Sequence, residues 1–105
     1  MKKTIFYYST ASVWEVSIKH TLHPDIMPVS GKELSDCCLK AGYEMLVIRD
    51  DHVYALETLL RTENAPRHND PFDRIMIAQA KAEHLDFITH DSLLTYYNEE
   101  CILCF

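Results

Sequence analysis

Three carboxylates stand at positions where an α/β fold gathers the ligands of a metal ion. Glu15 falls in the first turns after a predicted strand, and Asp91 follows another predicted strand by two residues. Asp73 falls in the first turn of a predicted helix. In an open parallel sheet, ligands bind at the carboxyl ends of the strands, where helix N-termini also converge. Carboxylates gathered there repel one another, so the pattern predicts a Mg²⁺ or Mn²⁺ site that polarises a phosphodiester and activates water.

Each of these acids also has a purely structural interpretation. Asp73 can complement the dipole of its helix, and Asp91 can cap the helix that follows it. Glu15 can be the acid of a capping box that begins at Ser12. Taken singly, capping is the commoner role for such residues. Taken together, three caps would have to share one sheet edge by coincidence, and Trp14 places a large anchor beside the charge of Glu15, so a metal site is favoured.

The elements that position these acids alternate between strands and helices. The predicted strands cover residues 4–8, 43–48, 87–89 and 101–105, and they are rich in β-branched, aromatic or other apolar side chains. Five helices are predicted from local start and stop signals. The first helix starts at Ser9, Thr10 or Ser12 and stops at Pro24, and the second starts at Ser30 with Glu33 and ends at Gly42. Asp50 and Asp51 start the third helix. Asp70 with Pro71 starts the fourth, which reaches about residue 84, and Asp91 starts a short final helix.

This alternation predicts a single α/β domain over residues 1–105, with a mostly parallel sheet of about four short strands flanked by helices. A composition of 48% hydrophobic and 25% charged residues is typical of a globular protein. No apolar run approaches the roughly 18 residues of a membrane span, and no signal-peptide pattern follows Met1, so the chain is predicted to be cytoplasmic. A net charge of −6 excludes a surface that attracts phosphates everywhere. Any contact with nucleic acid is therefore local.

The glycines and cysteines exclude further classes of site. The two glycines, Gly31 and Gly42, stand alone and cannot form a glycine-rich phosphate loop. The four cysteines are expected to be reduced in a cytoplasmic chain. Cys101 and Cys104 form a single C-x-x-C pair without a second pair of zinc ligands. We interpret residues 101–105 as a short buried strand in which cysteine acts as a small hydrophobe.

Three segments resemble one known family. Residues 9–19, STASVWEVSIK, resemble the S-x-A-S-x-W-E-I-x-I-K segment of PIN-domain ribonucleases of the VapC toxin type. Residues 68–80, HNDPFDRIMIAQA, resemble the family's H-x-D-P-F-D-R-x-L-I-A-Q-A segment, and residues 87–91, FITHD, resemble its strand ending in T-x-D. Order and spacing agree over essentially the whole chain, and the middle motif is highly specific.

The resemblance implies a metal-dependent ribonuclease. Members of the family hold Mg²⁺ or Mn²⁺ among clustered acids, cleave RNA, and include toxins held inactive by a cognate antitoxin. Glu15, Asp73 and Asp91 fall on the family's metal-binding acids. Asp70 falls on the acid that caps the helix, Arg74 on a partner residue without an assigned role, and Thr89 on the small hydroxyl residue that flanks the site. The resemblance also implies a homodimer, with no membrane partner.

This chain departs from the family at its start. Family members begin with another strand and helix, and an aspartate at the end of that strand is the first metal ligand. Three alternatives follow for the missing central strand: the strands at residues 4–8 and 87–89 pair directly, a second copy or a partner supplies a strand, or the natural start lies upstream. Because Mg²⁺ is often held by one or two carboxylates and water, three acids suffice for one ion. The chain is then a ribonuclease of impaired activity or, alternatively, a catalytically inactive PIN-like binding or dimerisation module.

Overall fold

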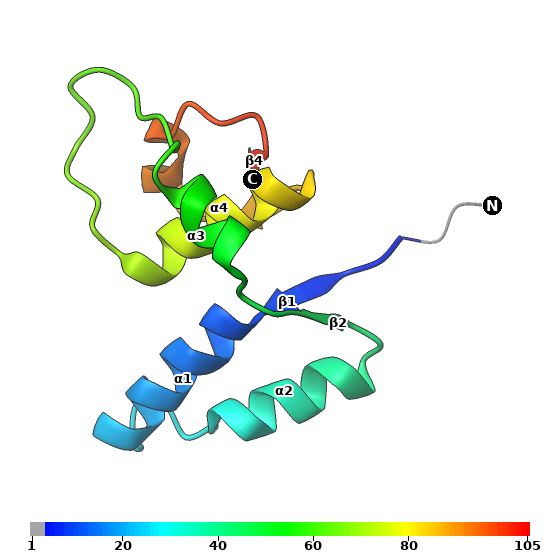
Figure 1. The fold of residues 1–105 in the computed structure, drawn as a ribbon. Helices are drawn as coiled ribbons and strands as arrows, with labels where there is room; N and C mark the ends of the chain where they lie inside the picture. The colour runs from blue at the N-terminus through cyan, green and yellow to red at the C-terminus, as the bar shows by residue number, and fades with distance from the viewer. Residues whose placement is uncertain (1–3) are drawn as a thin grey trace. The chain divides into compact units, whose positions relative to one another are not determined.

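The computed structural model describes residues 4–105 and divides the chain into two compact units. The first unit ends at Ile48, and the second spans Arg49–Phe105. The first contains β1 (Tyr7–Ser9), α1 (Thr10–Leu22), α2 (Gly31–Lys40) and β2 (Glu44–Leu46). The second contains α3 (Asp50–Leu56), α4 (Pro71–Glu83), β3 (Phe87–Thr89), the 3₁₀ helix η1 (Ser92–Tyr96) and β4 (Ile102–Cys104) (Figure 1). The α/β class is confirmed.

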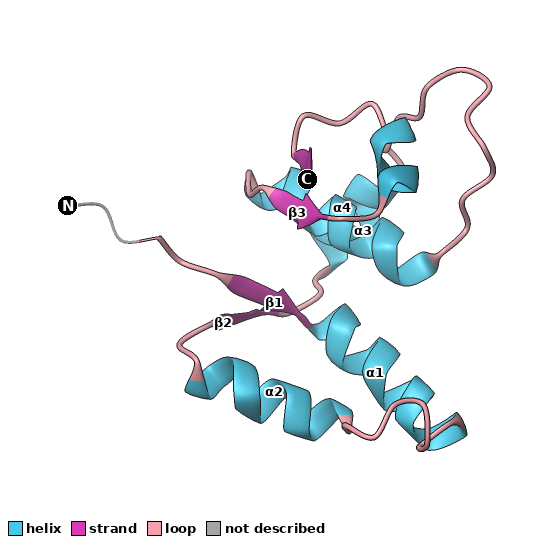
Figure 2. Cartoon of the chain, turned by 180° about the vertical axis from the view of Figure 1, so that it is seen from behind, coloured by secondary structure: helices cyan, strands magenta, loops and turns pink. Residues whose placement is uncertain are grey.

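The first unit is a parallel strand pair with two helices. β1 and β2 pair in parallel, with Tyr8 opposite Met45. α1 follows β1 directly, and its cap is Ser9, whose side chain accepts a hydrogen bond from the Ala11 N–H at 3.0 Å (Figure 2). The predicted capping box at Ser12 is wrong, because a helix that begins at the strand end already includes that residue.

The second helix of this unit has its predicted ends. The Ser30 side chain accepts a hydrogen bond from the Glu33 N–H at 3.1 Å, and Gly42 lies just past the helix with a φ of 91°, a conformation that favours glycine. α1 and α2 pack closely where α2 begins (Figure 1). A Cβ at Gly31 would lie 1.9 Å from the Ser17 Oγ, so only glycine fits at this crossing.

The second unit is organised around α4. The Asp70 carboxylate accepts hydrogen bonds from the N–H groups of Phe72 and Asp73 at 2.9 and 3.2 Å, and Pro71 occupies the first helical position. The helix ends at His84, which adopts the left-handed conformation. The predicted helix from Asp70–Pro71 to about residue 84 is therefore confirmed. Its inner face contributes to a core of Ile77, Leu94 and Tyr97, against which Leu59, Phe87, Cys101 and Ile102 pack.

α3 begins differently from the prediction. Asp50 and Asp51 lie inside its first turn, and Arg49 is the N-cap. The N–H of this cap residue is satisfied by the third helical residue, since His52 Nδ1 accepts a hydrogen bond from the Arg49 N–H at 3.0 Å. The two aspartates still lie where carboxylates complement the helix dipole.

The strands form two separate parallel pairs, β1 with β2 and β3 with β4, so the predicted sheet of about four strands is wrong in this respect. Each strand has three residues, and each pair joins two consecutive strands. Residues 4–8 do not pair with residues 87–89, so that alternative for the missing strand is not observed. The predicted C-terminal strand is present, but its predicted burial is wrong in part, because Leu103 and Phe105 are 47% and 75% exposed, whereas Ile102 packs against the core. Among the described residues, no helix has the length and apolar character needed to cross a membrane.

Candidate functional site

Two of the three predicted metal ligands belong to the second unit. Asp73 is in the first turn of α4, and Asp91 directly follows β3 and caps η1. The first half of α4 lies beside η1, because Ile77 packs on Leu94 in the core and Arg74 donates a hydrogen bond to the Tyr97 hydroxyl. This places the start of α4 next to the segment that Asp91 begins.

The third predicted ligand, Glu15, belongs to the first unit. It lies on α1, about a quarter exposed, and its Oε2 is 3.6 Å from the Lys19 Nζ one turn later. The predicted capping role of Glu15 is not observed, since Ser9 is the cap. That Glu15, Asp73 and Asp91 share one metal ion stays a prediction.

Asp73 is the end of a chain of polar contacts. Its Oδ2 lies 3.4 Å from His68 Nε2. The other ring nitrogen, His68 Nδ1, lies 2.8 Å from the Tyr97 hydroxyl, to which Arg74 Nη1 donates at 3.0 Å. Tyr97 is only 4% exposed and the His68 side chain 9%, so the middle of this chain is shielded from water. We call Arg74, Tyr97, His68 and Asp73 the His68 network.

Asp91 caps η1 in a way that is compatible with binding a metal ion. Its Oδ1 accepts a hydrogen bond from the Leu93 N–H at 3.0 Å, and its own N–H donates to Thr89 Oγ1 at 3.0 Å. The cap uses one carboxylate oxygen, and the residue is exposed at the surface. Capping and metal binding are therefore compatible for this side chain, as the sequence interpretation required.

Two arginines cluster on the ring of Tyr97. Arg61 Cζ lies 4.9 Å and Arg74 Cζ 5.8 Å from the ring centroid, within the range of cation–π attraction. The Arg61 Nε is buried without a hydrogen-bond partner in the described chain. Neither arginine takes part in an ion pair among residues 4–105. Positive charge without carboxylate partners thus lies beside the His68 network, in a chain that is acidic overall.

A second network in this unit was not predicted from the sequence. His52, which is fully buried, lies with Nε2 2.8 Å from Glu83 Oε1. Arg49 donates to Asp51 at 2.9 Å and also contacts Glu83. The hydrogen bond from His52 and the nearby Arg49 charge hold the pKa of Glu83 below its usual value, and Arg49 does the same for the pKa of Asp51. We call these four residues the His52 network.

The His52 network brings together the one group of three metal-ligand side chains found among the described residues, Asp51, His52 and Glu83, whose ligand atoms lie within 4.8 Å of one another. It does not suit a metal ion. Nδ1 of His52 already accepts the Arg49 N–H, so a neutral ring carries its proton on Nε2 and has no lone pair left for a metal. The Arg49 guanidinium also forms ion pairs with both carboxylates. The network is better explained as a structural ion cluster.

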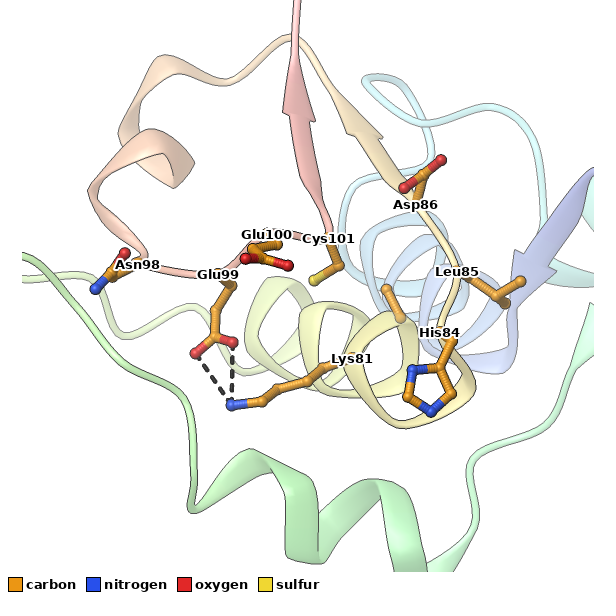
Figure 3. A pocket seen from close by; sticks show the side chains of 9 residues that line it. Lys81, His84, Leu85, Asp86, Asn98, Glu99, Glu100 and Cys101 are labelled. Carbon is orange, nitrogen blue, oxygen red and sulfur yellow. Dashed lines mark hydrogen bonds and ion pairs between the residues drawn. The ribbon is translucent and has the colours of Figure 1, made fainter.

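The cysteines do not form a reactive site. Cys101 lines a groove of about 530 Å³, where Lys81 forms an ion pair with Glu99 at 3.0 Å (Figure 3). Burial, with the nearby charge of Glu99, raises the pKa of the Cys101 thiol, which disfavours the reactive thiolate. All four cysteines are free thiols, and among the described residues none belongs to a group of three potential metal ligands.

Comparison with known proteins leaves the family open. No family model, curated protein or solved structure matches this chain. The geometry of the second unit and the motifs of the sequence therefore carry the functional argument.

Proposed function

We propose that the chain is a PIN-like domain of the VapC toxin type that hydrolyses RNA phosphodiesters with Mg²⁺ or Mn²⁺. Glu15, Asp73 and Asp91 are the proposed ligands. The observation that carries the proposal is the start of α4, where a capped helix presents Asp73 to the shielded side chain of His68.

The donor set fits a hard divalent cation. Mg²⁺ and Mn²⁺ prefer carboxylate oxygens, and one or two carboxylates with water suffice for Mg²⁺. Asp73 and Asp91 each stand at an element start that the fold fixes, since Asp70 caps α4 and Asp91 itself caps η1. A divalent ion held by them supplies Lewis-acid polarisation of the phosphodiester and lowers the pKa of a water molecule.

The chain's own cations then account for RNA binding despite the charge of −6. Arg61 and Arg74 lie over Tyr97 without carboxylate partners, and Arg67 is exposed on the preceding loop. Guanidinium groups recognise phosphates through several donors at once. Lys19, the other cation considered from the sequence, pairs with Glu15 instead.

The test is cleavage of single-stranded RNA by the purified chain with Mn²⁺. We expect cleavage by the wild type and its loss in Glu15→Gln and Asp73→Asn, because each removes one charged ligand while keeping the side-chain shape. Glu57→Gln, an exposed acid of the second unit, is the matched control and keeps the activity. A wild type that cleaves no better than Glu15→Gln contradicts the proposal.

A second candidate function is a catalytically inactive binding module. One face of α1 favours it, since Trp14, Ile18 and Leu22 follow one another there and are 57%, 37% and 65% exposed. Exposed apolar side chains on one helix face are typical of a protein interface. In either function, the proposed partners are a cognate antitoxin and a second copy of the chain in the cytoplasm. A wild type that gains no stability from Mn²⁺ favours the module.

A further inference from the structure

We propose that Tyr97 is a positioning residue, whose hydroxyl fixes His68 in the tautomer that presents Nε2–H to the carboxylate of Asp73. The consequence for metal binding rests on the proposed function, whereas the tautomer itself does not.

The direction of the hydrogen bonds follows from Arg74. A guanidinium has five N–H donors and no acceptor, so Arg74 Nη1 donates to the Tyr97 oxygen at 3.0 Å. The phenol proton is then directed at the other neighbour of that oxygen, His68 Nδ1, at 2.8 Å. Because Nδ1 accepts this hydrogen bond, the neutral imidazole carries its own proton on Nε2, the nitrogen 3.4 Å from Asp73 Oδ2.

Packing keeps the two rings in this relation. The His68 and Tyr97 rings meet edge to face, with centroids 5.5 Å apart and planes at 90°. The ring of Tyr97 is buried in the core with Ile77 and is flanked by the two arginines. With Tyr97 4% exposed, water cannot readily replace its hydroxyl as the donor to His68.

The contact with His68 restricts the orientation of the Asp73 carboxylate, which a metal would use. His68 belongs to the loop before α4, and its contact ties this loop to the first turn of the helix. Partners that orient a metal ligand in this way commonly change metal affinity by about 10- to 100-fold when they are removed. Tyr97 makes no contact with Asp73 itself in the hydrogen bonds described, so it acts through His68.

The first test needs no metal. Long-range ¹H–¹⁵N NMR spectra of the wild type at alkaline pH, where imidazole is neutral, report which His68 nitrogen carries the proton. We expect the Nε2–H form alone, and a mixture of both tautomers in Tyr97→Phe, which keeps the ring and removes the hydroxyl. An Nδ1–H form in the wild type, or an unchanged tautomer in Tyr97→Phe, overturns the proposal.

The second test measures Mn²⁺ affinity by calorimetry. We expect about 10-fold weaker binding in Tyr97→Phe, and unchanged binding in Tyr96→Phe, the adjacent tyrosine, which is 39% exposed. Equal affinities in the two variants overturn the positioning role. A wild type that shows the Nε2–H tautomer but binds no Mn²⁺ contradicts the proposed function and supports the tautomer assignment, so the two failures are distinguishable.

Discussion

The second unit contains two histidine–carboxylate pairs. Their ring nitrogens have the same roles, but the groups around the rings differ. In both, Nδ1 accepts a hydrogen bond and Nε2 faces a carboxylate, Glu83 for His52 and Asp73 for His68. The donor to His52 is a backbone N–H three residues away, whereas the donor to His68 is a side chain 29 residues away.

The arginines show the larger difference. Arg49 contacts the carboxylates of its network directly, so that the positive and negative charges are paired within it. Arg74 donates to the Tyr97 hydroxyl, and His68 lies between that hydroxyl and the carboxylate of Asp73. The same histidine geometry therefore yields a closed ion cluster in one case and an oriented carboxylate in the other, and we propose only the second as a cation site.

The comparison is tested most strongly by metal binding. We expect Mn²⁺ to raise the thermal unfolding temperature of the wild type and of Glu83→Gln, because the His52 network offers no lone pair to a metal. The same titration of Asp73→Asn is expected to show no shift, with metal affinity reduced by more than about 100-fold, since a ligand is lost and not merely reoriented. A shift that disappears in Glu83→Gln and persists in Asp73→Asn would exchange the roles of the two networks.

Stability is expected to depend on the His52 network instead. His52→Ala removes a fully buried side chain and leaves the Arg49 N–H and Glu83 without their partner. We expect a loss of about 2–4 kcal/mol in the free energy of unfolding by denaturant. His90→Ala, at an exposed histidine of the same unit, should cost less than about 1 kcal/mol.

An equally small loss in His52→Ala would show that the buried ring is not a structural centre. Retained Mn²⁺ affinity in His52→Ala would confirm that the two networks act independently, since a metal bound at His52 would be lost with the ring.

The sequence predicted those parts of the fold that depend on neighbours along the chain. The start of α4 carries its cap and its proline within two residues, and the ends of α2 are equally local. The places of Asp73 in the first turn of a helix and of Asp91 directly after a strand follow from the same kind of local signal. Each of these signals lies within one turn of the residue it positions.

Long-range pairing could not be predicted in the same way. His52 and Glu83 are 31 residues apart, and nothing in the residues around either one indicates the other. Tyr97 is similarly remote from His68. The number of strands in a sheet depends on which edges meet, and three-residue strands carry too little pattern to specify it.

The smallest expected effect is the pH dependence of the stability that Glu83 contributes through the His52 network. The pKa of Glu83 is lowered, first by the hydrogen bond from His52 and then by Arg49. A carboxylate whose folded-state pKa lies below its unfolded value stabilises the fold above the unfolded pKa, and this stabilisation is lost as the pH falls through the folded pKa. The unfolded value is about 4.3, so the loss begins below that pH.

We therefore expect the stability difference between wild type and Glu83→Gln, measured by denaturant unfolding, to shrink on acidification from neutral pH to below about 4. The exposed-acid variant Glu57→Gln should show the full acid dependence of the wild type. A difference that stays constant with pH would mean that Glu83 contributes by packing and not by charge, and the His52 network would then be no ion cluster.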